Sequence, residues 1–552
     1  LAGAFGLGWF VRWAGWKPLD PTNVSWLLNG EDWGTHLLGW LFFRNEPWAL
    51  PLGRLTSYVY PVGTTVAFTD STPWVATLLK PLSPLLPEAF QYIGPWLALC
   101  CVLMGVTGAL AVRAFTSNGW LQALGGALFV TSPLLIWRVG HPSLCAQWLL
   151  VAAIALSLAP AGEGRQARRF VWIALALSLL AAGIHPYLAA MTALLSLALF
   201  CRLSLIDRLA PPVAALGAAG VLAAGVAGVL ALFGLLGWGE TLSAHGFGFY
   251  NSDLLALINP RGQSRWLPDL PASRPHYEGW GFLGAGALAL IAFGAVSLLV
   301  RKRERAALPW RRALPLVIVA ALAALFSCAR EINVGGNTLI RLDVLYGPLA
   351  PVGEVLRGTG RFIWIAHYTL LAAAVLVAVR LWGSAVAGVA LVAALGLQVA
   401  DFSWTGVRVF SLPRLDAGLR SPAWQTLGAE YRHLALVPPQ IAYMRGNCEG
   451  EIPGHVRVPF AYLAYQQRMT INAGYLARYD GAAVRRACDD LLANVRSGQL
   501  DPNTVYLPGP LTLRALRSAR ANVTCGRLDG WPVCVSNERT TSLLSDLRLN
   551  PP

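Results

Sequence analysis

Charged residues are scarce in this sequence. Only 13% of its 552 residues are Asp, Glu, Lys or Arg, whereas soluble domains carry about 25%. Apolar residues make up 55%, and the mean hydropathy is +0.52. These values exclude an ordinary soluble domain and predict an integral membrane protein.

The sequence also lacks internal repeats, low-complexity tracts and the metal-binding spacings HxH and HExxH. No cofactor is therefore required by the sequence. A divalent cation (Mg²⁺ or Mn²⁺) held by His, Asp and Glu from separate loops stays open, with unknown ligands.

The formal net charge is +15. In a soluble protein such a charge indicates nucleic-acid binding, but here many arginines lie in short connections between apolar segments. Arginines in such connections orient a membrane protein and contact anionic headgroups. We therefore predict the lipid bilayer as a partner, and no nucleic acid.

Apolar windows predict a multi-spanning α-helical membrane protein, because a spanning helix needs about 20 mainly apolar residues. The first window is shorter than this, so we expect its span to begin before Leu1. In all, we expect about eleven spans, at 1–16, 92–112, 119–137, 143–160, 169–185, 187–204, 211–237, 281–300, 313–328, 362–379 and 384–400.

Arginine is unevenly distributed between the connections. By the positive-inside rule, the arginine-rich side is cytoplasmic. The long loops 17–91, 238–280 and 329–361 then face outward, as does the tail. We predict a membrane domain over 1–400 and a periplasmic domain over 401–552. The arginines of the alternate connections are Arg113, Arg165, Arg168, Arg169, Arg202, Arg208, those of 301–312, and Arg380.

The tail has seventeen arginines, no lysine and no apolar window long enough to span. It is long enough for a core of its own, and its mixed periods predict an α/β or α+β fold. GAAVRRACDDLLANVRSG (481–498) predicts a helix that stops at glycine. NTVYLPG (503–509) and WPVCVSN (531–537) predict strands, and QTLGAEYRHLALVP (425–438) predicts a helix that leads into a strand.

Nine cysteines occur. Five lie in or beside apolar windows and are expected to be small core residues. The four in the tail are Cys448, Cys488, Cys525 and Cys534, an even number that favours two disulfides in an oxidising compartment. A structural zinc is the alternative, although CxxC spacing is lacking. All three ways of pairing these four cysteines stay open, and the simplest joins Cys448 to Cys488 and Cys525 to Cys534.

The first outer loop carries acids at Glu31, Asp32 and Asp70. Five tryptophans lie in or just before it, and indoles favour the membrane–water boundary. One hypothesis makes Asp32 a general base at the membrane surface. The alternative makes Asp32 and Asp70 helix caps, but two acids that flank a loop rich in aromatic residues and arginine favour a site. Between these acids lie His36, Arg44, Glu46 and Arg54.

Two later segments add polar candidates. Arg361 begins a predicted span, where it either binds a lipid-linked phosphate or contacts headgroups. His141 and His185 lie near span ends, where a structural role is favoured. The loop 237–284 is rich in aromatic residues and offers Glu240, His245, Asp253, Arg261, Arg265, His276 and Glu278.

Several of these segments resemble a known superfamily. GEDWGTHLLGWLFFR (30–44), PLGRLTSYVYPVGTT (51–65), TDSTPW (69–74), HYEGWGFLG (276–284) and GTGRFIW (358–364) are similar to bacterial proteins assigned to the GT-C superfamily. These are multi-spanning glycosyltransferases that use polyprenyl-phosphate-linked sugars. The tail lacks the WWD motif of oligosaccharyltransferases.

The resemblance implies an inverting glycosyltransferase at the outer face of the bacterial inner membrane. Its donor would be a polyprenyl-phosphate sugar, and its acceptor a cell-envelope glycan or glycoprotein. The resemblance implies Asp32 as the base and Asp70 as a second acid. We predict substrate contacts for Glu31, His36, Arg44, Arg54, Arg261, His276, Glu278 and Arg361.

Two other classes of function stay open. A transporter or flippase for lipid-linked sugars would not need Asp32, and the chain shows no matching pair of interrupted spans. A non-catalytic membrane scaffold would depend on the tail and not on the loop acids. An O-antigen ligase transfers from a polyprenyl diphosphate and usually relies on outer-loop Arg and His, so the acids of the first loop disfavour this possibility.

Overall fold

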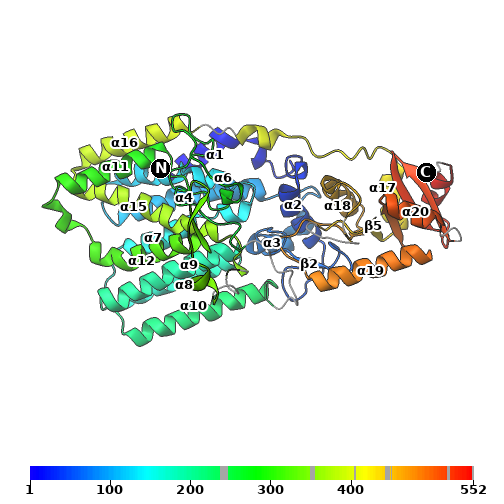
Figure 1. Cartoon of the computed structure of the whole chain (residues 1–552), viewed down its shortest axis with the longest axis horizontal. Coiled ribbons are helices and arrows are strands. Elements are labelled where there is room, and N and C mark those ends of the chain that lie inside the picture. The colour runs from blue at the N-terminus through cyan, green and yellow to red at the C-terminus, as the bar shows by residue number, and fades with distance from the viewer. Residues whose placement is uncertain are drawn as a thin grey trace. The chain divides into compact units, whose positions relative to one another are not determined.

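The chain folds into two compact units. The helical unit comprises Leu1–Leu19, Gly94–Leu230 and Ser243–Val407, and the sheet unit comprises Asp20–Ile93, Ala231–Leu242 and Arg408–Pro552. Figure 1 shows the elements of both. The computed structural model describes residues 1–236, 247–348, 353, 355–402, 406–441, 448, 450–518 and 522–549.

The helical unit contains the expected series of apolar helices. Each predicted span contains at least one helix, so the multi-spanning helical fold is confirmed. The predicted count of eleven spans is not, because seven helical segments in the described part are long and apolar enough to cross a membrane. These are 93–113, 119–137, 186–206, 212–232, 310–327, 359–381 and 384–401.

The remaining apolar helices are shorter or more charged. Segments 142–158 and 285–300 are apolar but short. The helices are α1 (Ala2–Ala14), α4 (Ile93–Arg113), α5 (Gly119–Val130), α6 (Pro133–Trp137), α7 (Trp148–Leu158), α8 (Arg165–Ala182), α9 (Pro186–Cys201), the π-helical turn η5 (Arg202–Ile206), α10 (Pro212–Leu232), α11 (Ala285–Val300), α12 (Trp310–Ser327), α13 (Asp343–Tyr346), α15 (Ile363–Leu381) and α16 (Ser384–Asp401).

The core of the helical unit forms around α15. The segment that contains α15 is 83% buried, whereas α10 is only 11% buried and lies at the edge. One cluster joins α15 to α4, α5, α11 and α16 through residues such as Leu128, Leu290 and Val375. Helix α1 packs closely on α4, because a Cβ on Gly6 or Gly105 would collide with a backbone carbonyl of the other helix.

Arginine-bearing connections meet at one end of these helices. Asp207 pairs with Arg202 at 2.8 Å and with Arg312 at 3.3 Å. The guanidinium of Arg301 lies 4.1 Å from the ring centre of Trp382. Three of the connections that the sequence places on one side therefore lie together. That this end is cytoplasmic stays a prediction.

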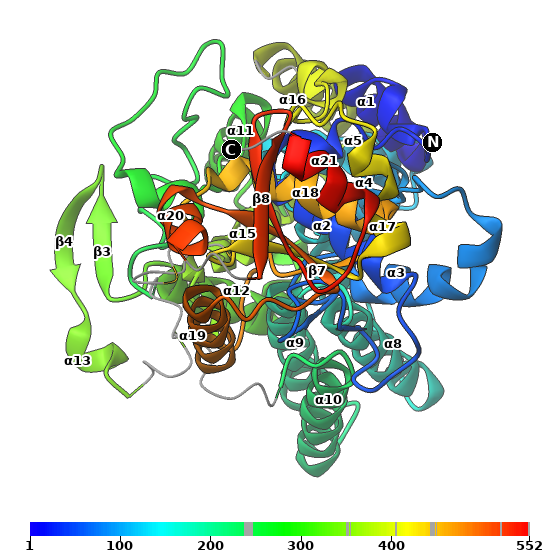
Figure 2. The ribbon, with the colours of Figure 1, turned by 90° about the vertical axis from the view of Figure 1, so that its right-hand side faces the viewer.

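A short hairpin, β3 (Glu331–Val334) and β4 (Asn337–Arg341), follows α12 (Figure 2). It belongs to the predicted outer loop 329–361. Its turn is Gly335–Gly336, where both glycines take positive φ angles of 59° and 81°. Glycine adopts such angles without steric cost, which explains the tight turn.

The sheet unit confirms the α/β fold of the tail. Its five strands have the order β6-β5-β7-β9-β8, with β5 parallel to β6 and β7, and with β9 antiparallel to β7 and β8. The elements of the tail are α17 (Ala423–Glu430), β5 (His433–Val437), α18 (Arg457–Gln466), β6 (Thr470–Ile471), α19 (Gly481–Ser497), β7 (Thr504–Pro508), α20 (Pro510–Ser518), β8 (Val523–Leu528), β9 (Trp531–Ser536) and α21 (Ser542–Leu549).

The local predictions for the tail are confirmed. Helix α19 begins after the N-cap Asp480, which accepts a hydrogen bond from the Ala483 amide at 2.8 Å. It ends at Gly498, which is left-handed with φ 71°. The predicted strands correspond to β7 and β9, and the predicted helix-to-strand segment corresponds to α17 and β5.

The first outer loop belongs to the sheet unit. Its elements are α2 (Glu31–Phe43), β1 (Arg54–Leu55), β2 (Thr64–Thr65), α3 (Pro73–Leu79) and the 3-10 helix η3 (Lys80–Leu85). The Ile471 amide donates to the Ser57 carbonyl at 2.9 Å, and the Tyr60 amide donates to the Ile471 carbonyl at 2.8 Å. Residues 57–60 thus lie along strand β6 of the tail.

Both tail disulfides are present, with the neighbour pairing. They join Cys448 to Cys488 and Cys525 to Cys534. All four sulfur atoms are therefore used, which excludes the alternative of a zinc held by these cysteines. Cys488 and Cys534 are fully buried in the core of the tail.

We predict that the two disulfides stabilise the tail unequally. They close loops with separations of 40 and 9 residues, and a longer loop removes more entropy from the unfolded chain. Replacement of Cys448 and Cys488 by Ser should lower the free energy of unfolding by about 4 kcal/mol, and replacement of Cys525 and Cys534 by about 3 kcal/mol. Denaturant unfolding of the full chain in detergent tests this order, and a larger loss for the 525–534 pair would contradict it.

Candidate functional site

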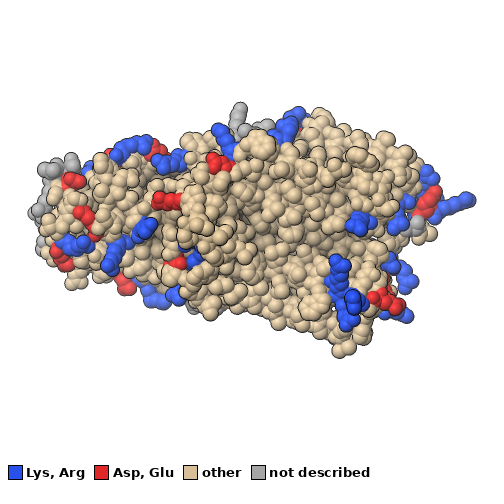
Figure 3. All heavy atoms as spheres, turned by 180° about the vertical axis from the view of Figure 1, so that it is seen from behind, with Lys and Arg blue, Asp and Glu red and all other residues tan. Residues whose placement is uncertain are grey.

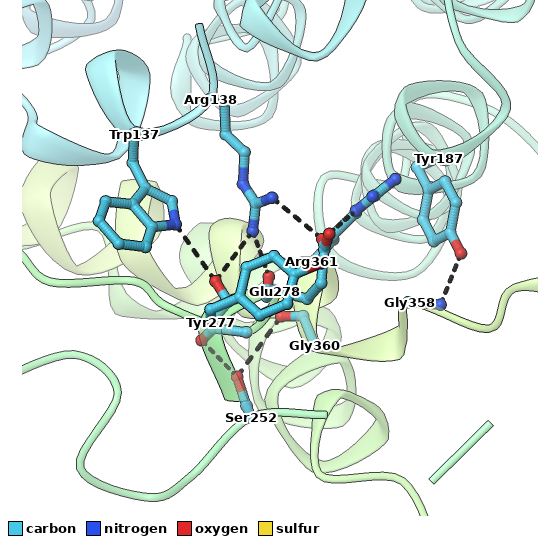
Figure 4. Close-up of polar contacts among 10 residues, drawn as sticks. Trp137, Arg138, Tyr187, Ser252, Tyr277, Glu278, Gly358, Gly360 and Arg361 are labelled. Atoms are coloured by element: carbon cyan, nitrogen blue, oxygen red, sulfur yellow. Dashed lines mark hydrogen bonds and ion pairs between the residues drawn. The ribbon is translucent and has the colours of Figure 1, made fainter. Parts of the chain in front are cut away.

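Glu278 lies between two arginines in the helical unit (Figure 4). Its Oε2 is 3.0 Å from Nη1 of Arg138 and 2.8 Å from Nε of Arg361. Arg138 follows α6, Glu278 follows the 3-10 turn Arg274–Tyr277, and Arg361 lies in the 3-10 turn Thr359–Phe362. Three segments that are distant in sequence therefore meet at one carboxylate.

Further contacts hold these segments in place. Arg138 Nη2 donates to the carbonyls of Tyr277 and Glu278, at 3.2 and 2.6 Å. The Arg361 guanidinium lies 4.5 Å from the ring centre of Tyr187, whose hydroxyl accepts a 2.6 Å hydrogen bond from the Gly358 amide. The side chains of the cluster are thus fixed before any ligand binds.

The cluster places two guanidiniums around one carboxylate in a buried place. The side chains of Arg138 and Glu278 are 2% and 6% exposed, and that of Arg361 is 13% exposed. Burial by itself would raise the pKa of Glu278, but the two guanidiniums outweigh it and hold this pKa well below its usual range. Glu278 is therefore ionised and a poor proton acceptor. Two cations against one anion suit the binding of a further anion, such as a phosphate.

The structure joins two residues that the sequence singled out separately, Glu278 and Arg361. Their substrate contacts stay predictions. Arg138 was missed because it follows an apolar segment and no motif surrounds it. A signal was available, since Arg138 lies at the end of a predicted span opposite to the arginine-rich connections.

Asp253 and His276 form a second buried cluster in the helical unit. Asp253 accepts hydrogen bonds from the amides of Gly335 and Gly336, at 3.2 and 2.9 Å, and so holds the β3–β4 turn. His276 Nδ1 lies 3.7 Å from its carboxylate. Arg261 donates to the Ser273 carbonyl at 3.2 Å. These contacts give Asp253, His276 and Arg261 a role in holding the loop. Substrate contacts of Arg261 and His276 stay predictions. Glu240 and His245 lie outside the described residues.

The acids of the first loop are not the N-cap residues of α2 and α3. The N-cap of α2 is Gly30, and that of α3 is Thr72. Asp32 lies inside the first turn of α2, where the helix dipole favours a negative charge. Asp70 takes a left-handed φ of 55°, two residues before the α3 cap. The capping alternative is therefore wrong for both acids, which are half-buried.

Neighbours of these acids are held by the sheet unit. Glu31 pairs with Arg457. The buried His36 places Nδ1 3.1 Å from the Thr69 carbonyl. One ligand atom of His36 and one of Asp70 lie within 4.8 Å of each other. A carboxylate and an imidazole at this separation are suited to share a divalent cation, and metal dependence stays a prediction.

The two loop arginines differ in their surroundings. Arg44 is 8% exposed and donates four hydrogen bonds of 2.7–3.1 Å to backbone carbonyls. These contacts fix the segment after η3, so the structure gives Arg44 a scaffolding role. Arg54 is exposed on β1. Substrate binding by either stays a prediction. The four carbonyls belong to Ser83, Leu86, Pro87 and Glu88.

Comparisons with known proteins give a family and a distant likeness. Residues 3–403 match the family described as a domain of unknown function (DUF6311), and residues 423–536 match the DUF6311 C-terminal domain. No curated protein matches the chain.

Two solved structures of the oligosaccharyltransferase from Archaeoglobus fulgidus are similar. One is tethered to an acceptor peptide that contains the NVT sequon, with 13% identity and a TM-score of 0.42, covering 86% of this chain and 63% of that one. The other, the archaeal oligosaccharyltransferase AglB with an inhibitory peptide and a dolichol-phosphate, has 12% identity and a TM-score of 0.41, covering 86% and 64%. The chain thus spans less than two thirds of these proteins.

We predict that Glu278→Gln strongly destabilises the helical unit. The change leaves two buried guanidiniums without their counter-charge, which typically costs about 3–5 kcal/mol. Glu304→Gln is a matched control, because Glu304 also lies 3.0 Å from an arginine but is 41% exposed. Exposed pairs contribute about 0–1 kcal/mol. Thermal unfolding in detergent measures both variants, and equal losses would show that the buried cluster does not stabilise the fold.

His276 should make stability depend on pH. Burial and the charge of Arg261 lower the pKa of His276 despite the opposing effects of Asp253 and Glu331. Folding therefore favours the neutral form of His276. The resulting contribution to the free energy of unfolding is complete above about pH 6.5 and is lost as the pH falls below that value.

We expect the melting temperature to fall between pH 7.5 and 5.5, and His276→Gln to reduce that fall. His455→Gln is the control, because His455 is exposed. An unchanged pH dependence in His276→Gln would contradict the assignment.

Proposed function

Since the chain belongs to the DUF6311 family, whose description names no activity, we propose a function for this member. It is an inverting glycosyltransferase that moves a sugar from a polyprenyl-phosphate donor to a cell-envelope glycan or glycoprotein. The reaction takes place at the outer face of the bacterial inner membrane. The loop segments similar to GT-C glycosyltransferases are the starting point of this proposal.

The observation that carries the proposal is the pair of buried guanidiniums around Glu278. A phosphate that leaves with the bonding electrons gains negative charge, and preorganised cations stabilise that change. Arg361 and Arg138 supply two guanidiniums, each with a nitrogen within 3.0 Å of Oε2 of Glu278. The cluster lies at the end of the helices opposite to Asp207 and its arginines, because Arg138 and Arg361 lie at the other ends of their helical segments.

The chemistry requires one proton acceptor. An acceptor hydroxyl attacks the anomeric carbon, the bond from that carbon to the phosphate oxygen breaks, and the configuration inverts. Asp32 takes the hydroxyl proton, and the polyprenyl phosphate leaves with the electron pair. Asp70 orients the acceptor, or holds a divalent cation with His36.

Three further features support the setting. The helical unit has seven segments fit to cross a membrane in its described part. Two disulfides in the tail suit an oxidising compartment such as the periplasm. Arginines gather at the opposite end of the helices, as expected for a cytoplasmic face.

The proposal is tested by transfer of radiolabelled sugar from a polyprenyl-phosphate donor to membrane glycans, with the purified full chain. Asp32→Asn keeps the size of the side chain but cannot accept a proton, so transfer should fall by a factor of about 10² to 10⁴. Asp20→Asn is the matched control, because Asp20 is exposed and bonded locally to Thr22. Equal transfer by a folded Asp32→Asn variant would overturn the role of Asp32.

The same assay tests the anion site. Arg361→Gln removes one guanidinium and leaves Glu278 paired with Arg138, so the fold should persist. The KM for the donor should rise by about tenfold or more. Arg341→Gln is the control, because its side chain is 74% exposed. An unchanged KM would show that the cluster is not part of the donor site. If the parent and all variants bind the donor but none of them transfers the sugar, the result would favour a flippase.

A further inference from the structure

A cavity of about 490 Å³ lies in the helical unit, away from the cluster around Glu278. Its walls come from α8, α9, η5 and α10, which lie side by side in both ribbon views (Figures 1 and 2). The lining is almost entirely apolar, and Arg168 is its one charged member. Representative lining residues are Val171, Trp172, Phe200, Leu203 and Ala215.

The cavity opens where hydrocarbon chains would surround the protein. Helix α10 forms one wall and is only 11% buried within the protein, so most of its surface faces outward. Trp172 on α8 is 66% exposed. Leaving a cavity of this kind unfilled sacrifices dispersion contacts that an acyl chain would restore. The shape and lining therefore fit a hydrocarbon chain.

The cavity is also close to the arginine-rich end of the helices. The turn η5 contributes Leu203 to the lining, and its first residue, Arg202, pairs with Asp207. The nearby acid Asp207 is thus already neutralised by Arg202 and Arg312. Lys and Arg side chains gather at this end of the helical unit, while much of the surface beside it is uncharged (Figure 3).

Arg168 stands at this boundary with neighbours of the same charge. Arg168 and Arg169 follow Arg165 by three and four residues on α8, so each is a surface neighbour of Arg165, and all three are exposed. Three like charges on one face repel each other, and an anion between them relieves that repulsion. A basic group beside a gap between spanning helices is the arrangement that recognises an anionic headgroup.

We propose that this cavity is a binding site for an anionic diacyl phospholipid of the surrounding bilayer. One acyl chain fills the apolar cavity between α8 and α10, and the headgroup phosphate is held by Arg168 with Arg165 and Arg169. The apolar lining selects a lipid over free phosphate, and the arginines select an anionic headgroup over a zwitterionic one. The site is separate from the proposed donor site and does not depend on the proposed transferase activity.

Native mass spectrometry of the purified full chain tests the proposal, with phosphatidylglycerol and phosphatidylcholine of identical acyl chains as probes. The parent protein should bind phosphatidylglycerol more tightly. Arg168→Gln should reduce this preference by about fivefold, the effect expected of one arginine at a membrane surface. Arg113→Gln is the matched control, because Arg113 is an exposed arginine at the end of α4 that does not line the cavity.

A second pair of variants tests the acyl chain. Ala215→Phe fills the cavity and should weaken the binding of both lipids. Leu216→Phe is its control, because Leu216 is the next residue on α10, is 73% exposed and does not line the cavity. Since Arg168 is exposed, Arg168→Gln should fold even if Ala215→Phe does not.

Three results would overturn the proposal. The first is an unchanged preference for phosphatidylglycerol in Arg168→Gln. The second is equal lipid binding by folded Ala215→Phe and Leu216→Phe. The third is binding of inorganic phosphate as tight as that of phosphatidylglycerol, because it would show that the acyl chain contributes nothing.

Discussion

The ion pairs of Glu278 with Arg138 and Arg361 are the contact on which the loop end of the helical unit depends. A buried charge is costly unless it is paired and hydrogen-bonded. The three residues meet this requirement only when the turn after α6, the loop before α11 and the turn before α15 come together. The pairing therefore fixes irregular backbone beside the membrane, where unsatisfied polar groups are expensive.

The same constraint explains why charge is sorted to the two ends of the helices. Asp207 gathers Arg202 and Arg312 at one end, and Glu278 gathers its two arginines at the other. Within the spans, His367 of α15 contacts groups of two other segments, Ser132 and the Gly281 carbonyl, at 2.9 and 2.8 Å. Each end of the helices is thus fixed by one buried acid that holds two arginines from different segments.

The sheet unit shows how a loop obtains structure from a distant part of the chain. Residues of the first loop pair with Ile471, and Glu31 pairs with Arg457 of α18. Helix α2 of the loop buries the residues from Gly34 to Phe43, and α18 of the tail packs against it. Packing against the tail holds Asp32 and Asp70 on ordered backbone, which a proton acceptor or a metal ligand requires.

The sequence by itself determined the features that depend on local pattern. Apolar windows located the helices, because a spanning segment must be apolar along its whole length. Asp480 and Gly498 marked the ends of α19 through capping, and the strands of the tail followed from short apolar runs. The count of eleven spans is not confirmed, because α8 has three arginines among its first five residues and 142–158 and 285–300 are short.

Only the tertiary structure decided which side chains meet. The partners Arg138 and Glu278 are 140 residues apart, and Glu278 and Arg361 are 83 apart, so no local pattern could join them. The caps of α2 and α3 were also misjudged, because the backbone at Gly30 and Thr72, rather than the nearby acids, sets where each helix begins. Ion pairs and cavities depend on the approach of distant segments, and the free energy of that approach comes from packing that a single sequence window does not contain.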